Sequence, residues 1–296
     1  IIPANSVAEE SGNSEGIFGF GDTGTFTAIT NLVSNAGVVA TDTAGVGTGR
    51  QGIAACEYGG DKAIFGFGIN GSYTAITNLV SNAGVVATDT AGVGTARYQP
   101  SACEYGGDKG IFGFGYTPSL VSMTNLVSNA GVVGTDVTGV GTARRGSAAC
   151  EYGEDKAIFG FGNDGSAVGM TNLVSNTGVV STDVAGVGTA RNVLAACSYG
   201  GDKGIFGYGW VSGAVSITNL VSNAGIVATD VAGVGTTRYH LAACEYGGDK
   251  AIFGYGNTGS IYVSITNLVS NAGVVASDQA ATTGTARHNL AACSFN

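Results

Sequence analysis

The feature that most constrains this chain is an internal repeat with a period of 47 residues. The string NLVSN recurs with four steps of 47 residues and a last step of 48, beginning at Asn31, Asn78, Asn125, Asn172, Asn219 and Asn267. One cysteine and one arginine recur with the same spacing. Self-similarity at a fixed period means that one supersecondary unit has been copied, so the sequence predicts six equivalent modules.

The composition allows a packed core and excludes several classes of protein. Charged residues make up only 11% of the 296 residues and hydrophobic residues 44%, which excludes a disordered polyelectrolyte. Glycine contributes 52 residues but not every third position, which excludes collagen. No apolar run approaches the roughly 18 residues that a membrane-spanning helix needs. We therefore expect no membrane insertion, and the net charge of −9 predicts no binding to nucleic acid or to anionic membrane surfaces.

Each repeat reads as a set of short strands. In the unit 54–97 the apolar segments AACEYG, AIFGFG, AITNLVSN and VVATD are short, rich in β-formers and bounded by glycine. YGGDK and SNAG are typical of hairpin turns. We therefore predict a four-stranded antiparallel meander, with strands a to d in this order. Alternation along strand b predicts that Phe65 and Phe67 share one face, and that the glycines on the other face admit a bulky side chain from the neighbouring sheet.

The size and frame of the repeat predict a ring. About 47 residues with four strands is the size of a propeller blade. The first copy lacks strand a, and the chain ends on an orphan strand a at 290–296. In an open stack this strand would leave unpaired edges, whereas in a ring it completes the first blade. We predict one all-β domain over 1–296, a six-bladed β-propeller of four-stranded antiparallel blades closed by the C-terminal strand. The first blade combines 16–50 with 287–296, and the other repeats span about 51–97, 98–144, 145–191, 192–238 and 239–286.

A recurring motif carries a family resemblance. An arginine precedes the innermost strand, and the second strand ends in aromatic-Gly-aromatic-Gly, as in Arg97, 102–105 and 111–115. This pattern resembles the Kelch-type propeller repeat over almost the whole chain, and it is similar to repeats of uncharacterised Kelch-like proteins of marine microbes and phages. The usual adjacent glycine pair is Gly-aromatic-Gly here, and the tryptophan of the fourth strand is absent. The resemblance implies partner binding on the face of the b–c loops. Recent duplication and consensus design both account for copies this similar.

The copies differ from one another in two places. One is the loop between strands b and c, which reads INGSYTA at 69 and WVSGAVS at 210, and the other is the triplet after each repeat arginine. In an antiparallel four-stranded blade both segments emerge at the same end of the sheet. We therefore predict one variable face and one uniform face. Loops on a rigid scaffold commonly carry binding specificity, and neutral drift in exposed loops is the alternative interpretation.

The variable positions are rich in aromatic, amide and basic side chains, a mixture typical of recognition surfaces. The predicted binding residues are Tyr73, Tyr98, Gln99, Tyr116, Arg145, Asn163, Asn192, Trp210, Tyr239, His240, Tyr262, His288 and Asn289. They predict a non-catalytic module that binds a protein or a glycan. The alternative is a structural building block of a virion, sheath or fibre, or a designed scaffold, whose discs stack through the uniform face.

The sequence contains no recognisable catalytic or metal-binding pattern. No CxxC or Cys/His cluster occurs, so the six cysteines are expected to be buried thiols. The residue after the cysteine is acidic in four copies, namely Glu57, Glu104, Glu151 and Glu245. Such a ring is a candidate cation site or a catalytic cluster, but we prefer simple hydrogen bonding to backbone or arginine. We expect no enzyme activity, no cofactor and no metal.

The charged residues that recur in every copy are expected to be structural. One aspartate per repeat, such as Asp89, and one arginine, such as Arg97, suit a charge-assisted hydrogen bond made once in each blade. The sequence shows neither a signal peptide nor an initiator methionine. The first residues fit the start of a mature secreted protein, and a trimmed chain would look the same; the expected location is extracellular or in a virion.

Overall fold

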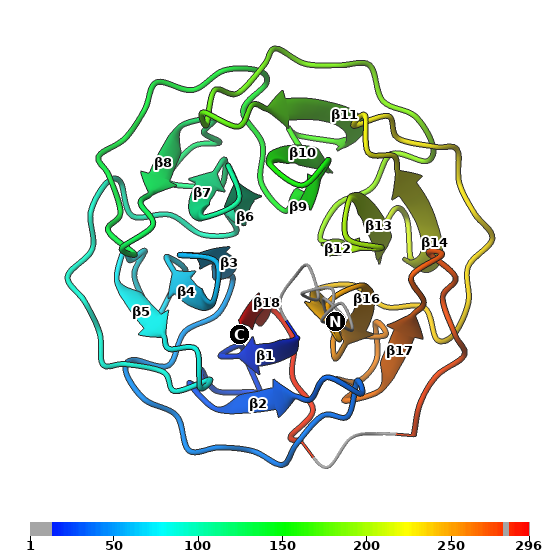
Figure 1. Cartoon of the computed structure of the whole chain (residues 1–296), viewed down its shortest axis with the longest axis horizontal. Helices are drawn as coiled ribbons and strands as arrows, with labels where there is room; N and C mark the ends of the chain where they lie inside the picture. Colours follow the sequence, from blue (N-terminus) through cyan, green and yellow to red (C-terminus); the bar gives the residue numbers. More distant parts are fainter. Residues whose placement is uncertain (1–13, 281–283, 296) are drawn as a thin grey trace, which may run out of the picture.

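The computed structural model describes residues 14–280 and 284–295. These residues contain no helix, and their strands form six antiparallel sheets of three strands each. Figure 1 shows the six sheets arranged around a central axis, which is compatible with a six-bladed propeller. Within the described ranges there is accordingly no helix of the length and hydropathy that crossing a membrane requires.

Each sheet has an inner strand nearest the axis, a middle strand and an outer strand (Figure 1). The inner strands are β3 (Ala54–Tyr58), β6 (Ser101–Tyr105), β9 (Ala148–Tyr152), β12 (Ala195–Tyr199), β15 (Ala242–Tyr246) and β18 (Ala291–Phe295). The middle strands are β1 (Glu15–Gly19), β4 (Lys62–Gly66), β7 (Lys109–Gly113), β10 (Lys156–Asn163), β13 (Lys203–Trp210) and β16 (Lys250–Gly254). The outer strands are β2 (Thr30–Val33), β5 (Thr77–Val80), β8 (Thr124–Val127), β11 (Ala167–Val174), β14 (Ala214–Val221) and β17 (Thr266–Val269).

One sheet is assembled from both ends of the chain. β18 pairs antiparallel with β1, which places Cys293 opposite Ile17 and Phe295 opposite Glu15. β1 pairs with β2 on its other side. Figure 1 shows β18, in dark red, beside β1, in blue. The last strand of the chain therefore belongs to the same sheet as the first two.

The predicted fourth strand is not a regular strand in the described residues. In the second repeat it meets β5 only through two isolated bridges, from Val80 to Val86 and from Thr77 to Thr90. Three residues lie between Val86 and Thr90 but only two between Thr77 and Val80, so one extra residue interrupts the ladder as in a β-bulge. The side-chain amide of Asn78 occupies the gap and donates to the Ala87 carbonyl oxygen at 3.0 Å. The expectation of four regular strands was therefore wrong.

Glycines of the middle strands make room for aromatic rings of the next sheet. A side-chain carbon on Gly66 would lie 2.9 Å from the ring of Phe112, and one on Gly254 would lie 2.7 Å from the ring of Phe18. Both rings are fully buried. The predicted role of the strand glycines is confirmed, and it applies between the last and first sheets as well as between consecutive ones.

The prediction that Phe65 and Phe67 share one face is wrong. Phe67 has φ of +64°, so the extended alternation of β4 ends at Gly66. The ring centroid of Phe65 lies 5.2 Å from that of Phe20 in the preceding repeat, whereas that of Phe67 lies 5.0 Å from that of Phe112 in the following repeat. The left-handed residue thus turns the second aromatic ring to the other neighbour.

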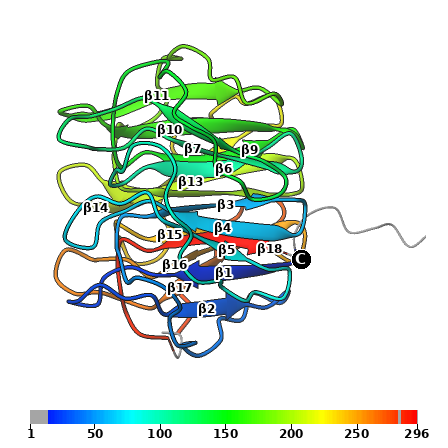
Figure 2. The ribbon, with the colours of Figure 1, turned by 90° about the vertical axis from the view of Figure 1, so that its left-hand side faces the viewer.

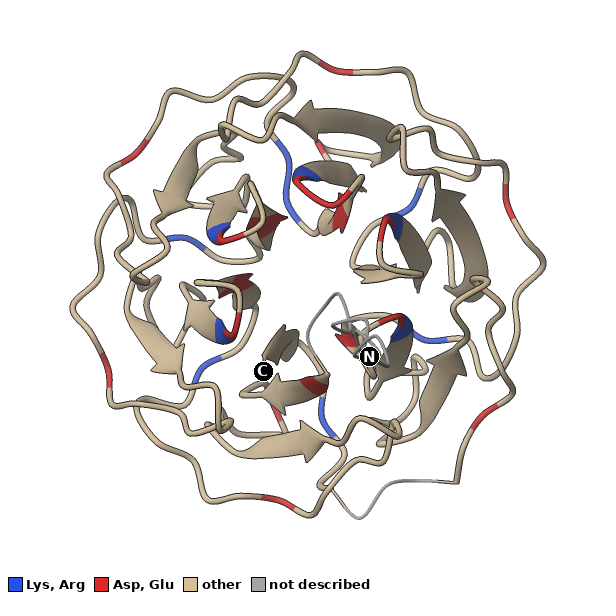
Figure 3. Cartoon of the chain, viewed as in Figure 1, with Lys and Arg blue, Asp and Glu red and all other residues tan. Residues whose placement is uncertain are grey.

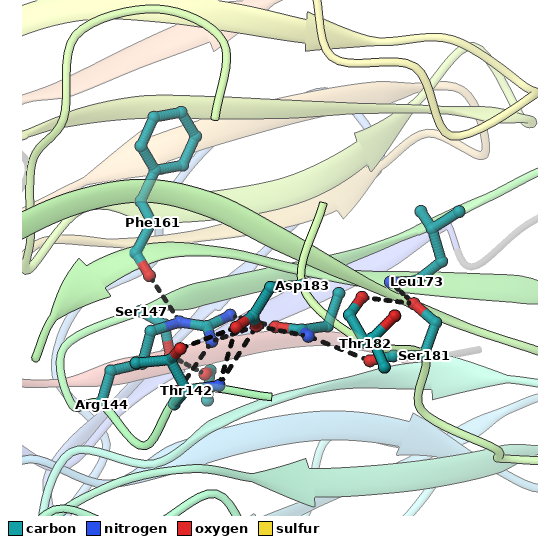
Figure 4. Close-up of polar contacts among 10 residues, drawn as sticks. Thr142, Arg144, Ser147, Phe161, Leu173, Ser181, Thr182 and Asp183 are labelled. Atoms are coloured by element: carbon teal, nitrogen blue, oxygen red, sulfur yellow. Dashed lines mark hydrogen bonds and ion pairs between the residues drawn. The ribbon is translucent and has the colours of Figure 1, made fainter. Parts of the chain in front are cut away.

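A buried arginine links each pair of neighbouring sheets. The guanidinium carbon of Arg144 lies 4.0 Å from the ring centroid of Phe114, and its Nε donates to the carbonyl oxygen of Phe161 in the next repeat at 2.8 Å (Figure 4). Its Nη2 donates to the Asn172 side-chain oxygen at 2.7 Å. Burial lowers the pKa of Arg144 to about 10, so the guanidinium remains charged at pH 7.

An aspartate completes this contact. Asp183 accepts hydrogen bonds from the side-chain amide of Asn172 at 2.9 Å and from the hydroxyl of Thr142 at 2.7 Å (Figure 4). Burial raises the pKa of Asp183, but these hydrogen bonds outweigh it and hold the pKa below the ordinary value. Because Thr142 belongs to the preceding repeat, the predicted structural role of the aspartate is confirmed.

The same contacts join the last repeat to the first. Thr285 N donates to Asp42 at 3.0 Å, and Arg287 Nε donates to the Phe20 carbonyl oxygen at 2.9 Å. In Figure 3 basic positions lie between neighbouring sheets and acidic positions recur along the outermost connecting segments. One arginine and one aspartate of each repeat therefore serve to join neighbouring repeats.

Candidate functional site

The two segments that differ between repeats meet at one rim of the molecule. The residue after each repeat arginine forms an isolated bridge with the first residue of a b–c loop, as Tyr98 does with Tyr116 and Arg145 with Asn163. The corresponding pairs are Gln51 with Ile69, Asn192 with Trp210, Tyr239 with Asn257 and His288 with Asp22. We call this edge the variable rim, and the predicted common location of both segments is confirmed. In Figure 2 the end of β18, marked C, lies at the opposite rim.

A cycle of six backbone hydrogen bonds surrounds the axis at the variable rim. It involves the second residue after each repeat arginine, whose N–H donates to the carbonyl oxygen of its counterpart in the preceding repeat. The donor–acceptor pairs are Gly52–Asn289 at 2.9 Å, Gln99–Gly52 at 2.8 Å, Gly146–Gln99 at 3.4 Å, Val193–Gly146 at 2.7 Å, His240–Val193 at 2.9 Å and Asn289–His240 at 2.9 Å. All six residues have φ between +48° and +59°. We call this arrangement the rim cycle.

The side chains of the rim cycle break its symmetry. Only Gly52 and Gly146 are glycine, the residue that adopts positive φ most easily. A side-chain carbon on Gly52 would collide with the ring of Tyr98, and one on Gly146 would lie 2.9 Å from Val193. The two glycines therefore leave space that neighbouring variable side chains occupy.

A pocket of about 340 Å³ opens on the variable rim beside the axis. It is lined by Tyr98, Gln99, Arg145, Gly146, Asn163, Asn192, Val193, Trp210, Tyr239 and His240. All of these except Gly146 and Val193 are among the predicted binding residues. The volume falls within the range of about 300–1,000 Å³ that is usual for small-molecule sites. The structure thus brings eight of the thirteen predicted residues into one cavity.

The two lining residues that were not predicted belong to the same variable triplets. Gly146 follows Arg145, and Val193 follows Asn192. Their position in those triplets was the available signal, but neither side chain is polar or aromatic. Val193 has φ of +48°, which is strained for a β-branched residue and is not readable from the sequence.

Arg145 is the one charged side chain that lines the pocket. Its guanidinium carbon lies 4.9 Å from the ring centroid of Tyr116. Within the described ranges its guanidinium has neither a hydrogen-bond partner nor an ion pair, and the Asn192 amide and the Trp210 indole N–H have no hydrogen-bond partner either. The pocket therefore presents several donors that are free to bind a ligand.

Aromatic rings continue from the pocket along the rim. The ring centroids of Trp210 and Tyr239 are 4.8 Å apart and those of Tyr239 and His240 are 5.0 Å apart. His240 lies 5.7 Å from His288, which stacks on Tyr262 at 4.2 Å. These five side chains form one continuous aromatic arc.

The remaining predicted residues support the pocket from outside it. Tyr73 packs edge-on against Tyr116 at 6.1 Å, behind Arg145. Asn289 takes part in the rim cycle, and its side-chain amide donates to Gln51 Oε1 at 2.9 Å. Tyr73, Tyr116, Tyr262, His288 and Asn289 are therefore near the pocket without lining it.

Both histidines are neutral at pH 7. Burial, aided by His288 and Arg145, lowers the pKa of His240 to about 3. Burial also lowers the pKa of His288. Gln99 Nε2 lies 3.5 Å from His240 Nδ1 across the rim. Among the described residues that line the pocket, Arg145 is therefore the one that is positively charged at neutral pH.

A second cluster of titratable groups surrounds the axis farther from the variable rim. The glutamates Glu57, Glu104, Glu151 and Glu245 line a cavity of about 40 Å³ together with the cysteines. Burial and the neighbouring carboxyls raise the pKa of Glu104 and Glu151 to about 9, so both are neutral at pH 7. Glu57 accepts a hydrogen bond from Ser294 N at 2.8 Å, the backbone contact that we preferred for these side chains. In the described part of the chain no three His, Cys, Asp or Glu residues are arranged to hold a metal ion.

The six cysteines are buried and free. The Cys56 sulfur occupies the space beside Gly110, 2.5 Å from where a side-chain carbon would lie, and the same holds for Cys150 beside Gly204 and Cys244 beside Gly16. Alanine stands at the equivalent positions 63, 157 and 251 of the other repeats. Burial raises the pKa of every one of these thiols, as in Cys150, which makes them poor nucleophiles.

Comparison with known proteins gives no family assignment. A scan against protein-family models found no match, and a search of curated proteins found no similar sequence. The all-β architecture of six antiparallel sheets therefore rests on the structure, and the Kelch-type resemblance stays a prediction.

Proposed function

We propose that this chain is a closed, Kelch-like six-bladed propeller that acts as a non-catalytic recognition module and binds a carbohydrate in the variable-rim pocket. The observation that carries this proposal is which residues line the pocket: all ten lie in the segments that differ between repeats, and eight of them are predicted binding residues. Neutral drift predicts substitutions scattered over all loops. It does not account for unpartnered donors and aromatic rings that converge on one cavity.

Three sets of contacts support the closed form. They are the pairing of β18 with β1, the bond of Thr285 to Asp42 and the return of the rim cycle from Asn289 to Gly52. A closed scaffold holds loops from four successive repeats in fixed positions, which lowers the entropic cost of binding.

The chemistry of the pocket suits a saccharide. A sugar ring presents apolar C–H faces and polar hydroxyl edges. The edge-on pair of Trp210 and Tyr239 offers aromatic surface to the C–H faces. The side-chain amides of Asn192 and Gln99 offer hydrogen bonds to the hydroxyl groups. A stable protein partner would need about 800 Å² of contact on each side, which extends far beyond a cavity of this size.

A glycan array combined with intrinsic fluorescence tests the proposal. Trp210 is the single tryptophan of the chain, so its emission reports on the pocket without labelling. We expect one group of saccharides to bind and to shift this emission, and Tyr239→Ala to weaken binding at least tenfold. Gln51→Ala, at the equivalent position of another repeat, should bind like the parent.

Two outcomes would overturn this proposal. A blank array together with capture of a protein that Tyr239→Ala abolishes would replace the carbohydrate by a protein partner. A blank array and a blank pull-down with folded chain would contradict recognition altogether.

A structural building block is the second candidate, and one observation favours it. Six aliphatic side chains at equivalent positions after the c–d turns are 64–68% exposed. They are Val38, Val85, Val132, Val179, Ile226 and Val274. Electron microscopy would support this role if it found regular stacks of the protein and if the stacks were lost when all six aliphatic residues were replaced by serine.

A further inference from the structure

We infer that the saccharide bound in the pocket carries a carboxylate and that Arg145 recognises it. This inference rests on the proposed recognition function and names the ligand class for the same site.

First, Arg145 is the one arginine at its position in the repeat. The equivalent positions of the other repeats are Gln51, Tyr98, Asn192, Tyr239 and His288. None of these residues is charged at pH 7, because burial lowers the pKa of His288. The preceding Arg144 has its donors bound inside the sheet junction, whereas Arg145 lines the pocket. The repeat therefore has a second arginine that the shared architecture does not use.

The second step is the fixed position of this side chain. The backbone of Arg145 is held by reciprocal hydrogen bonds with Asn163 of 3.0 and 2.9 Å. Its guanidinium lies over Tyr116, which is itself braced by Tyr73. A guanidinium held over an aromatic ring loses less freedom when it binds a carboxylate, since its planar fork is already oriented.

The third step is the absence of a competing anion in the described structure. No Asp or Glu lines the pocket. The acidic residues of nearby b–c loops are engaged locally: Asp22 accepts from Gly24 N at 2.6 Å, and Asp164 accepts from Ser166 N at 3.2 Å. Neither forms an ion pair with Arg145 within the described residues.

The fourth step is the cost of covering a charge. A ligand that fills the pocket removes water from the guanidinium, and an uncompensated charge in such a site is expensive. A carboxylate compensates for the lost hydration of the guanidinium, because it accepts two parallel charge-assisted hydrogen bonds from it. The aromatic pair Trp210 and Tyr239 belongs to the next two repeats, so the sugar ring lies on their side of the pocket and the carboxylate on the side of Arg145.

Matched acidic and neutral saccharides test the inference. The probes are digalacturonic acid and N-acetylneuraminic acid, each beside its methyl ester, which keeps the shape and removes the charge. Binding is measured by calorimetry and by Trp210 emission. We expect at least one acid to bind at least about tenfold more tightly than its ester, and added salt to reduce that preference.

Three variants separate recognition from folding. Arg145→Gln should abolish the preference for the acid. Arg145→Lys should retain only part of this preference, because an ammonium cannot form the bidentate contact. Gln51→Ala, the equivalent position outside the pocket, should retain the full preference.

Each alternative outcome has a distinct meaning. Equal binding of acid and ester overturns the inference and leaves carbohydrate recognition standing. Binding of galactose 6-sulfate in place of both acids overturns the carboxylate assignment. Binding of no saccharide of either kind removes the proposed function together with the inference.

Discussion

The N–H of Gly52 donates a hydrogen bond of 2.9 Å to the carbonyl oxygen of Asn289, near the other end of the chain. This bond returns the rim cycle to the repeat in which it began. The pocket lies beside this cycle and takes its walls from four successive repeats. Three other bonds of the same cycle, which link Gln99, Gly146, Val193 and His240, run along the pocket wall.

Removal of residues 290–296 should prevent cooperative folding. The deletion removes β18 and exposes the backbone of β1 as an unpaired edge, which favours aggregation. Light scattering and thermal unfolding measure the effect. A chain that lacks only Asn296 retains β18 and should behave like the parent, whereas parent-like unfolding of the longer deletion would show that β18 is dispensable.

Arg144→Lys should destabilise the protein by about 3 kcal/mol, because a lysine cannot replace the donors that bind Phe161 and Asn172 in a buried site. The adjacent Arg145→Lys is the matched control, and we expect a change within about 0.5 kcal/mol, as for most surface substitutions. Urea unfolding of both variants measures the difference. Equal midpoints would contradict a junction role for Arg144.

Gly66→Ala should cost about 1–3 kcal/mol, since the added carbon would lie 2.9 Å from the buried Phe112 ring. Gly213→Ala is the control, because no atom lies within 4 Å of that site. The cost of Gly66→Ala should be smaller in a Phe112→Leu background, so that the double variant is more stable than the sum of the two single changes predicts. If the double variant is no better than the sum of the single changes, the close approach of ring and glycine is not the cause.

Stability should fall as the pH rises from about 4.5 to about 9. In the unfolded chain Glu104 and Glu151 ionise near their ordinary pKa of 4.5, whereas in the folded chain their pKa is about 9. Unfolding therefore releases protons over this range, and the penalty grows with pH. Asp183 acts in the opposite sense and below this range, because its folded pKa lies under 3.8.

The double substitution Glu104→Gln and Glu151→Gln should flatten this dependence and raise the melting temperature at pH 8. Glu154→Gln, which removes an exposed glutamate that adds only the smallest contribution to the raised pKa of Glu151, should change the profile much less. A parent profile that is flat or rises between pH 5 and 8 would count against buried neutral carboxyls.

Much of the architecture could be predicted because repetition is visible in a single sequence. Six copies of NLVSN give the number of sheets, and the orphan strand at 290–296 indicates that it must pair with the first copy. The location of both variable segments on one rim follows from antiparallel order alone, as the bridge between Tyr98 and Tyr116 illustrates.

The rest depends on local backbone geometry that residue types do not encode. Phe67 adopts a left-handed conformation that ends the alternation of the strand, and in this conformation its carbonyl oxygen accepts a hydrogen bond from Nε of the buried Arg50 at 2.9 Å. The extra residue before Thr90 replaces a fourth strand by two bridges. The sequence places Tyr262 and Tyr239 on the same rim. Only the structure shows that Tyr239 lines the pocket and that Tyr262 does not.

Hydrogen exchange with and without the most strongly bound saccharide tests most directly whether the variable rim is the recognition surface. We predict slower exchange of amides in 98–99, 145–147, 192–194 and 239–241, and no change in the hairpin turns 59–62 and 106–109 at the opposite rim. Protection confined to those turns, or spread equally over all six repeats, would contradict recognition by the variable rim.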